Sequence, residues 1–337
     1  MDKKMTDNAP VALTIGDPAG IGPELSLRIA SEPSYMPSRA LLLIGSAELL
    51  HRVADAVGLD VEIRVVEDPA DARPDPGVAY VLNVPMDAAS VVPGQVSASC
   101  GQAAVEAIEV SARLALEGKV AAVCSAPANK EAFNAAGHHF EGQTEIYAHL
   151  TKTEAFHTIL VGGPLRVSLV SAHCSMLEAV ARVKADRIER ILGELHTAMR
   201  DHFGVAEPRI GVAGLNPHAG ENGVFGTEEI EHVKPALEKC RAAGMNLSEP
   251  LAADSLFAAA EAGRYDAVLV MYHDQGTIPL KRYGYVTYAA GLPIIRTTAG
   301  HGTAFDIAWQ GKADPSLLAR AVNLAGELAQ SSAAAAP

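Results

Sequence analysis

Short runs of aliphatic and β-branched residues recur along the chain, and each leads into a polar loop and then a longer stretch. Six such runs predict strands: Val11–Ile15, Ala40–Ile44, Val120–Cys124, Arg166–Ser171, Arg209–Ala213 and Ala267–Met271. The apolar spacing of the intervening stretches predicts amphipathic helices, among them Ala104–Leu116, Ala185–His202 and Ile230–Ala243. Strands that alternate with helices favour an open, largely parallel sheet covered by helices on both faces.

Length and composition refine this prediction. A chain of 337 residues exceeds what one hydrophobic core usually serves, so two domains are expected. Hydrophobic residues make up 49% and charged residues 20%, which is typical of a folded globular protein. The four cysteines are widely separated and form no CxxC pair, which indicates free thiols and not a disulfide framework: Cys100, Cys124, Cys174 and Cys240.

The charge balance excludes some partners. With 27 basic and 40 acidic residues, the formal net charge is −13, so nucleic acid and anionic membranes are poor partners for the surface. No apolar run approaches the roughly 20 residues that cross a bilayer. The beginning of the chain lacks the apolar core of a signal peptide, and a cytoplasmic location is therefore expected.

The loop from Gly16 to Glu24 follows the first predicted strand. Its glycines suit a tight turn from strand to helix, but it matches neither G-x-G-x-x-G nor the ending of a P-loop. Two interpretations of this loop therefore remain: it binds phosphate, or it is a turn that caps a helix.

Three histidines, His173, His218 and His273, each follow a predicted strand. They should lie at the carboxyl edge of a parallel sheet, where open α/β folds form their ligand crevices. Three imidazoles meeting there would suit a divalent ion and leave coordination positions for substrate. Spacing alone also allows three loop histidines on different faces that never meet.

Charged residues occur close to these histidines in the sequence. Asp254 and Asp274 could orient metal ligands or transfer protons, and Lys281 and Arg296 favour an anionic substrate. The alternative for the two basic residues is a pair of surface charges.

Four motifs carry a resemblance to a known family: Ile15–Glu24, Gly214–Glu221, Met271–Gly276 and Gly291–Thr297. Through them, from about Val11 to about Ala329, the chain resembles the 4-hydroxythreonine-4-phosphate dehydrogenase family of the pyridoxal-phosphate pathway. The resemblance implies a fold like that of isopropylmalate and isocitrate dehydrogenases, with two α/β domains and a cleft between them. The first domain would comprise residues 11–130 and 284–330, and the second would comprise 131–283, with the metal site and the dimer interface.

The resemblance also assigns roles to residues. It implies that His173, His218 and His273 bind one divalent ion (zinc, magnesium, manganese or cobalt) that two subunits of a homodimer share. It implies substrate contacts by the residues matching the family's motifs, which are Thr144, Lys281 and Arg296. It implies NAD or NADP binding at the loop that resembles the adenine-side loop of the larger fold, with the contributing residues His301, Gly302, Thr303, Ala304 and Asp306. Asp254 and Lys281 are the candidates for the general base, and the sequence does not choose between them.

The implied reaction is the oxidation of a secondary alcohol in a small anionic hydroxy acid. The expected substrate is 4-hydroxythreonine 4-phosphate or a close relative, and decarboxylation of the 3-keto product would follow. A divalent ion would act as a Lewis acid, and the nicotinamide would accept the hydride. This activity would make the chain an oxidoreductase of pyridoxine biosynthesis.

Three departures from the family pattern lie near the expected substrate site. Gln143 stands where the family has histidine, Thr287 replaces an asparagine, and Gly300 replaces an aspartate before His301. Gln143 cannot become cationic and offers less to a phosphate. Neutral drift is one interpretation; a changed substrate is the other, such as 4-phosphorylated threonate or erythronate, or an unphosphorylated cis-dihydrodiol carboxylate. A metal-dependent hydrolase and a non-catalytic binding protein are more distant alternatives.

Overall fold

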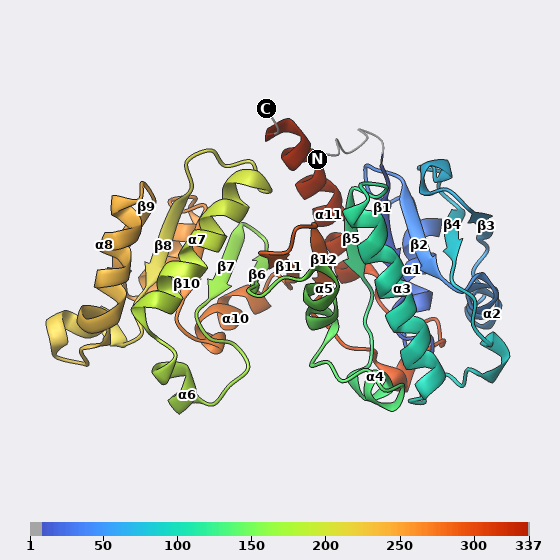
Figure 1. Cartoon of the computed structure of the whole chain (residues 1–337), viewed down its shortest axis with the longest axis horizontal. Helices are drawn as coiled ribbons and strands as arrows, with labels where there is room; N and C mark the ends of the chain where they lie inside the picture. Colours follow the sequence, from blue (N-terminus) through green and yellow to red (C-terminus); the bar gives the residue numbers. More distant parts are fainter. Residues whose placement is uncertain (1–8, 336–337) are drawn as a thin grey trace. The chain divides into compact units, whose positions relative to one another are not determined.

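The computed structural model describes residues 9–335, which form two compact units. Within that range, unit 1 comprises residues 9–155 and 292–333, and unit 2 comprises residues 156–291 together with residues 334–335. Unit 1 therefore uses both ends of the chain and unit 2 its middle. The divisions fall after residue 155 and after residue 291, away from the boundaries expected near Lys130 and Tyr283. The two units are coloured along the sequence in Figure 1.

Unit 1 is built on a parallel sheet in the order β3-β4-β2-β1-β5-β12. Its strands are β1 (Val11–Thr14), β2 (Leu41–Gly45), β3 (Glu62–Val66), β4 (Val78–Asn83), β5 (Ala122–Ser125) and β12 (Arg296–Ala299). All residues of β1, β2 and β5 are buried. Burial on both faces explains why these strands read as continuous apolar runs.

The helices of unit 1 begin at local signals in the sequence. They are α1 (Gly22–Ser31), α2 (Ala47–Val57), α3 (Ala98–Leu116), α4 (Lys130–Ala135), α5 (Gln143–Thr151) and α11 (Ser316–Ala335), with short 3-10 turns η1 (Pro69–Asp71), η2 (Ala88–Ser90) and η5 (Phe305–Ile307). Ser46 caps α2 and Ser97 caps α3, each by accepting a backbone N–H bond at 3.2 Å. Helix α3 packs against β1, β2 and β5.

Close packing between helices explains where unit 1 ends. At Gly101, in α3, an added Cβ would lie 2.0 Å from the carbonyl oxygen of Ala132 in α4. Helix α5 also packs on α3, so both short helices belong to unit 1. The sequence-based boundary near Lys130 placed them in the other domain because the apolar pattern does not reveal which sheet a short helix covers.

Unit 2 contains a mixed sheet in the order β11-β6-β7-β10-β8-β9. Its strands are β6 (His157–Gly162), β7 (Leu165–Leu169), β8 (Arg209–Ala213), β9 (Asn246–Leu251), β10 (Ala267–Val270) and β11 (Val286–Ala290). Strands β7, β10, β8 and β9 are parallel, whereas β6 is antiparallel to both β7 and β11. The β6–β7 hairpin turns at Gly163, where φ is +54°.

The helices of unit 2 follow its strands. They are α6 (Met176–Ala181), α7 (Ala185–Asp201), α8 (Lys234–Ala242), α9 (Ala253–Glu261) and α10 (His273–Lys281), with a 3-10 turn η3 (Pro217–Gly223) and a π-helical turn η4 (Glu229–Val233). Helix α7 packs on β6, β7 and β11, and Figure 1 shows it lying over the strands of unit 2. Because β7, β8 and β10 are parallel, the segments that follow them emerge at one edge of this sheet.

The six predicted strands are confirmed as β1, β2, β5, β7, β8 and β10. The cysteines Cys100, Cys124, Cys174 and Cys240 are all free thiols, as the sequence predicts. Among residues 9–335, no helix has the length and apolar character needed to cross a membrane.

Candidate active site

Two of the three predicted metal ligands lie together in unit 2. His173 is in the loop after β7, and His273 is the first residue of α10. Their ring centroids are 5.4 Å apart, with an interplanar angle of 45°. A cavity of about 320 Å³ is lined by both, together with Cys174, Tyr272 and Asp274. The two rings are thus close enough to bind one small ligand.

Asp274 orients one of these histidines. Its Oδ1 lies 2.8 Å from Nδ1 of His273, which leaves Nε2 of that ring free. A carboxylate on the second ring nitrogen is the usual partner of a metal-binding imidazole, because it fixes the tautomer and the ring direction. The donor set therefore fits a divalent ion such as zinc.

The third histidine lies apart from the pair. His218 follows β8 in η3, and its side chain is 72% exposed. It lies 3.7 Å from the carboxylate of Glu221 and edge-on to the ring of Phe225. In the part of the chain that the structure describes, no three His, Cys, Asp or Glu side chains are arranged to hold a metal ion. A single copy of the chain thus brings together two of the predicted ligands and not the third.

Three further residues of unit 2 were predicted to belong to the site: Asp254, Lys281 and Thr287. Asp254 is exposed at the start of α9 and lines a cavity of about 460 Å³ together with Asp274. Lys281 is exposed at the end of α10. Thr287 is half-buried in β11, opposite Leu160. The candidate base Asp254 and the predicted ligand His273 thus flank neighbouring cavities.

Arg296 forms the centre of a polar cluster in unit 1. It begins β12, is 3% exposed, and donates to Thr144 Oγ1 at 2.8 Å and to Ser125 Oγ at 3.4 Å. Its guanidinium lies 5.3 Å from the ring centroid of Tyr147. Burial lowers the pKa of Arg296, although Tyr147, Cys124 and Glu145 act in the opposite direction. Among residues 9–335 Arg296 forms no ion pair, although the charge of Glu145 raises its pKa, so the buried guanidinium is left without a carboxylate partner.

Gln143 and Thr144 open helix α5 beside this cation. The preceding residue, Gly142, provides no side-chain cap for the helix. The amide nitrogen of Gln143 donates to the carbonyl oxygen of Ala126 at 3.0 Å, which fixes the direction of the amide. Its Oε1 is buried and accepts no hydrogen bond from the residues the structure describes. The cluster thus combines a buried positive charge, a helix N-terminus and an unused acceptor.

The predicted cofactor loop follows β12 in unit 1. The carbonyl of Thr303 accepts from Ile21 N at 3.0 Å, and Ala304 has φ +40°. At Gly302 an added Cβ would meet no atom within 4 Å, and Asp306 is exposed. His301 Nδ1 lies 3.2 Å from the carbonyl of Gly302. The loop is therefore open at Gly302 and at the exposed Asp306, whereas Nε2 of His301 is buried.

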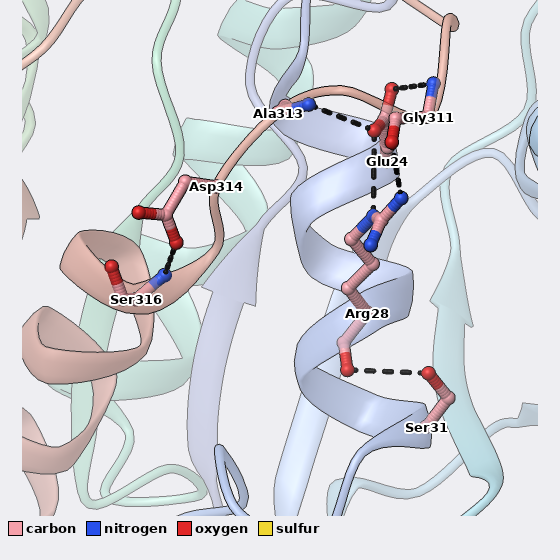
Figure 2. A network of polar contacts seen from close by, with 7 residues as sticks. All are labelled: Glu24, Arg28, Ser31, Gly311, Ala313, Asp314 and Ser316. Carbon is pink, nitrogen blue, oxygen red and sulfur yellow. Dashed lines mark hydrogen bonds and ion pairs between the residues drawn. The ribbon is translucent and has the colours of Figure 1, made fainter.

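The buried carboxylate of Glu24, in α1, accepts hydrogen bonds from the chain that follows the predicted cofactor loop. Figure 2 shows Glu24, fully buried, facing the backbone N–H groups of Gly311 and Ala313, which both donate to it at 3.3 Å. Arg28 pairs with Glu24 at 3.4 Å and donates to the carbonyl of Gly311 at 2.7 Å. The Gly16–Glu24 loop therefore packs against the segment that contains the predicted cofactor residues, with Ile21 bonded to Thr303 and Glu24 to Gly311 and Ala313.

Sequence reasoning assigned no role to several residues of these clusters. Ser125 and Tyr147 support Arg296 although they lie far from it in sequence. Asp17 is fully buried, and burial raises its pKa to about 6 against an opposing backbone hydrogen bond from Ala19. The only sign of this in the sequence is that Asp17 is an acidic residue within an apolar, glycine-rich loop.

Comparison with known proteins is consistent along the whole chain. Residues 38–325 match the family model described as pyridoxal phosphate biosynthetic protein PdxA. A D-threonate 4-phosphate dehydrogenase of Pectobacterium atrosepticum is 42% identical, over 95% of this chain and 99% of that protein. A 4-hydroxythreonine-4-phosphate dehydrogenase of Desulforapulum autotrophicum is 39% identical, over 95% and 96%.

Solved structures agree with the fold. The crystal structure of 4-hydroxythreonine-4-phosphate dehydrogenase from Klebsiella pneumoniae has a TM-score of 0.91 and 42% identity, covering 96% of this chain and 100% of that one. A terephthalate 1,2-cis-dihydrodiol dehydrogenase from Burkholderia xenovorans has a TM-score of 0.67 and 33% identity, covering 94% and 98%. The chain therefore belongs to the PdxA family and is a dehydrogenase acting on a CH–OH group.

Proposed function

We propose that this dehydrogenase uses NAD or NADP and a divalent ion to oxidise the secondary alcohol of a small, 4-phosphorylated hydroxy acid. The observation that carries the proposal is the His173–His273 pair, with Asp274 on the outer nitrogen of His273. A bound divalent ion supplies Lewis acidity to the substrate hydroxyl and so lowers its pKa. In a substrate with a carboxylate β to the new ketone, oxidation is followed by loss of carbon dioxide.

The third imidazole would come from a second copy of the chain. His218 is exposed and apart from the pair, while the segments that carry the histidines also bear exposed apolar side chains. They are Met176, Leu177, Val180, Val224, Phe225, Ile230 and Ile278. Large apolar side chains that are exposed in one copy are candidates for burial in a protein interface. We infer a homodimer in which His173 and His273 of one copy share an ion with His218 of the other.

The anionic part of the substrate would bind at Arg296 and Thr144. A buried guanidinium with no carboxylate partner, next to the uncapped start of α5, is a strong site for phosphate or carboxylate. Gln143, Lys281 and Thr287 are proposed as further contacts on the same substrate. Gln143 would accept a hydrogen bond from a substrate hydroxyl or ammonium, because its amide nitrogen is already bound to Ala126.

The cofactor would bind at the loop formed by His301, Gly302, Thr303, Ala304 and Asp306. Asp254 is proposed as the general base, since it lines a cavity that it shares with Asp274, the neighbour of His273. Lys281 remains the second candidate for this role. A base at either position would take the proton of the hydroxyl while hydride leaves for the nicotinamide.

The names of the relatives suggest three substrates, and we choose among them as follows. The relatives at 42% identity are named D-threonate 4-phosphate dehydrogenases, and one at 39% is named for 4-hydroxythreonine 4-phosphate. We favour D-threonate 4-phosphate. In that case Gln143 and Thr287 belong to a site adapted to a substrate without an amino group, and a role in pyridoxine biosynthesis does not follow. An unphosphorylated cis-dihydrodiol carboxylate is the second candidate, supported by the solved relative at 33% identity.

The test is NADH or NADPH formation by zinc-, magnesium-, manganese- or cobalt-loaded protein. D-threonate 4-phosphate and 4-hydroxythreonine 4-phosphate are each compared with their unphosphorylated forms, and a cis-dihydrodiol carboxylate is included. We expect the highest kcat/KM with D-threonate 4-phosphate and at least a tenfold loss without the phosphate. Preference for the dihydrodiol would overturn the proposed substrate class.

A further inference from the structure

The turn that carries His218 has a backbone that ordinary L-residues avoid. Residues 218–222 have φ values between 43° and 78° in succession. Only Gly220 among them is a glycine; the others are His218, Ala219, Glu221 and Asn222. Left-handed backbone is disfavoured for each of these four residues because Cβ approaches the following carbonyl oxygen. Such a turn persists only where surrounding contacts hold it.

Asn216 Nδ2 donates to Glu228 Oε2 at 2.7 Å, and the other side-chain contacts of this segment go to one buried carboxylate, that of Glu229. It is 1% exposed and accepts from the backbone nitrogen of Asn216 at 2.8 Å and from Asn216 Nδ2 at 2.9 Å. Asn216 stands two residues before His218. At Gly220 an added Cβ would lie 2.7 Å from Glu229 Oε2, so the turn is wrapped directly onto this carboxylate.

The environment of Glu229 indicates a role other than an ion pair. Within the described residues, no cationic side chain lies within ion-pair distance of it, and its recorded donors are both on Asn216. Burying a carboxylate without a cation is costly. Glu229 also begins the π-helical turn η4, an irregularity that is frequent at functional sites.

We propose that Glu229 is a positioning residue for the metal site: it holds the left-handed turn and thereby sets the direction in which His218 leaves the subunit. The turn presents the His218 side chain 72% exposed, edge-on to Phe225 with ring centroids 5.9 Å apart. Without Glu229 the backbone relaxes toward right-handed values, and the imidazole loses its fixed direction. This inference rests on the proposed role of His218 as the third ligand.

The test is the affinity for Zn²⁺, measured by competition with a chromophoric chelator, in Glu229→Ala and Glu229→Gln. The matched control is Glu231→Gln, since Glu231 is exposed on the same turn and its side chain accepts, among residues 9–335, only from Thr227. We expect Glu229→Ala to weaken zinc binding by about 10- to 100-fold, the usual effect of losing a group that orients a ligand. Glu229→Gln keeps one acceptor oxygen for Asn216 and should recover most of that loss, while Glu231→Gln should bind as wild type does.

Gly220→Ala provides an independent variant, because its Cβ would push against Glu229 without removing any polar group. Gly220→Ala should also weaken zinc binding. The d–d spectrum of the Co²⁺-loaded protein should change in Gly220→Ala and in Glu229→Ala. The folding midpoint and dimer fraction of each variant are measured alongside.

His218→Ala separates this inference from the proposed function. If His218→Ala loses zinc affinity while Glu229→Ala and Gly220→Ala bind zinc as wild type does, the positioning role is wrong and the metal site stands. If His218→Ala binds zinc normally, the proposed ligand set is wrong and the positioning role falls with it.

Discussion

Arg296 donates a hydrogen bond to the hydroxyl of Thr144 at 2.8 Å, although the two residues are 152 positions apart in the sequence. The contact brings together the beginning of β12 and the first turn of α5. It places a buried guanidinium where the helix N-terminus adds to its positive potential.

Arg296→Met tests whether this cation serves a ligand or the fold. The unliganded protein buries the charge without a carboxylate partner, so we expect the free energy of unfolding to stay within about 1 kcal/mol of wild type or to rise. Without the charge, KM for the phosphorylated substrate should rise by about 100-fold or more. Denaturant unfolding and steady-state kinetics measure the two effects, with the exposed Arg264→Met as control. A large loss of stability with unchanged KM would assign Arg296 to the fold.

Gln143→His tests the consequence of the neutral side chain at this position. A histidine there should introduce a titration near its usual pKa of about 6.5 into the pH profile of kcat/KM for a phosphorylated substrate, with higher values on the acid side. The wild-type profile should lack that step. Profiles that coincide between pH 5.5 and 8 would show that position 143 does not contact the anion.

Asp17 makes stability depend on pH. Burial raises its folded-state pKa from 3.8 to about 6, so between these values the folded state holds a proton that the unfolded state has released. Its contribution is therefore fully present below the unfolded pKa and is lost as pH rises through the folded pKa. Two pK units correspond to about 3 kcal/mol.

Asp17→Asn should remove this dependence and be more stable than wild type at pH 7.5, by up to about 3 kcal/mol. Urea unfolding at pH 4.5 and 7.5 measures it, with the exposed Asp55→Asn as control. Equal pH dependence in wild type and Asp17→Asn would show that Asp17 is ionised in the folded protein throughout this range.

Glu24→Gln tests the link between α1 and the segment at Gly311 and Ala313. The amide keeps the hydrogen-bond geometry in part but loses the ion pair with Arg28, so unfolding should become easier by about 1–3 kcal/mol. Glu32→Gln, at the end of the same helix, should cost less than about 0.5 kcal/mol. Chemical denaturation of both variants makes the comparison; similar small losses would mean that the network in Figure 2 contributes little.

Much of the fold could be predicted from the sequence because buried parallel strands leave continuous apolar runs, as at β1, β5 and β10. The antiparallel β6 could not, since the direction of a strand leaves no trace in its apolar pattern. The proximity of His173 and His273 follows from their places after parallel strands. The left-handed turn at His218 could not be predicted because it is accompanied by hydrogen bonds from Asn216 to Glu228 and Glu229, and the local preference of its residues disfavours it.

The central claim is a metal site completed by a second copy of the chain, and mixing inactive variants tests it most directly. His173→Ala and His218→Ala protomers are unfolded together, refolded and assayed. If His173 and His273 of one copy act with His218 of the other, each mixed dimer contains one complete site. Random assembly should then restore about a quarter of wild-type activity, whereas mixing His173→Ala with His273→Ala should restore none. Recovery in neither mixture, with mixed dimers demonstrated, would contradict a shared site.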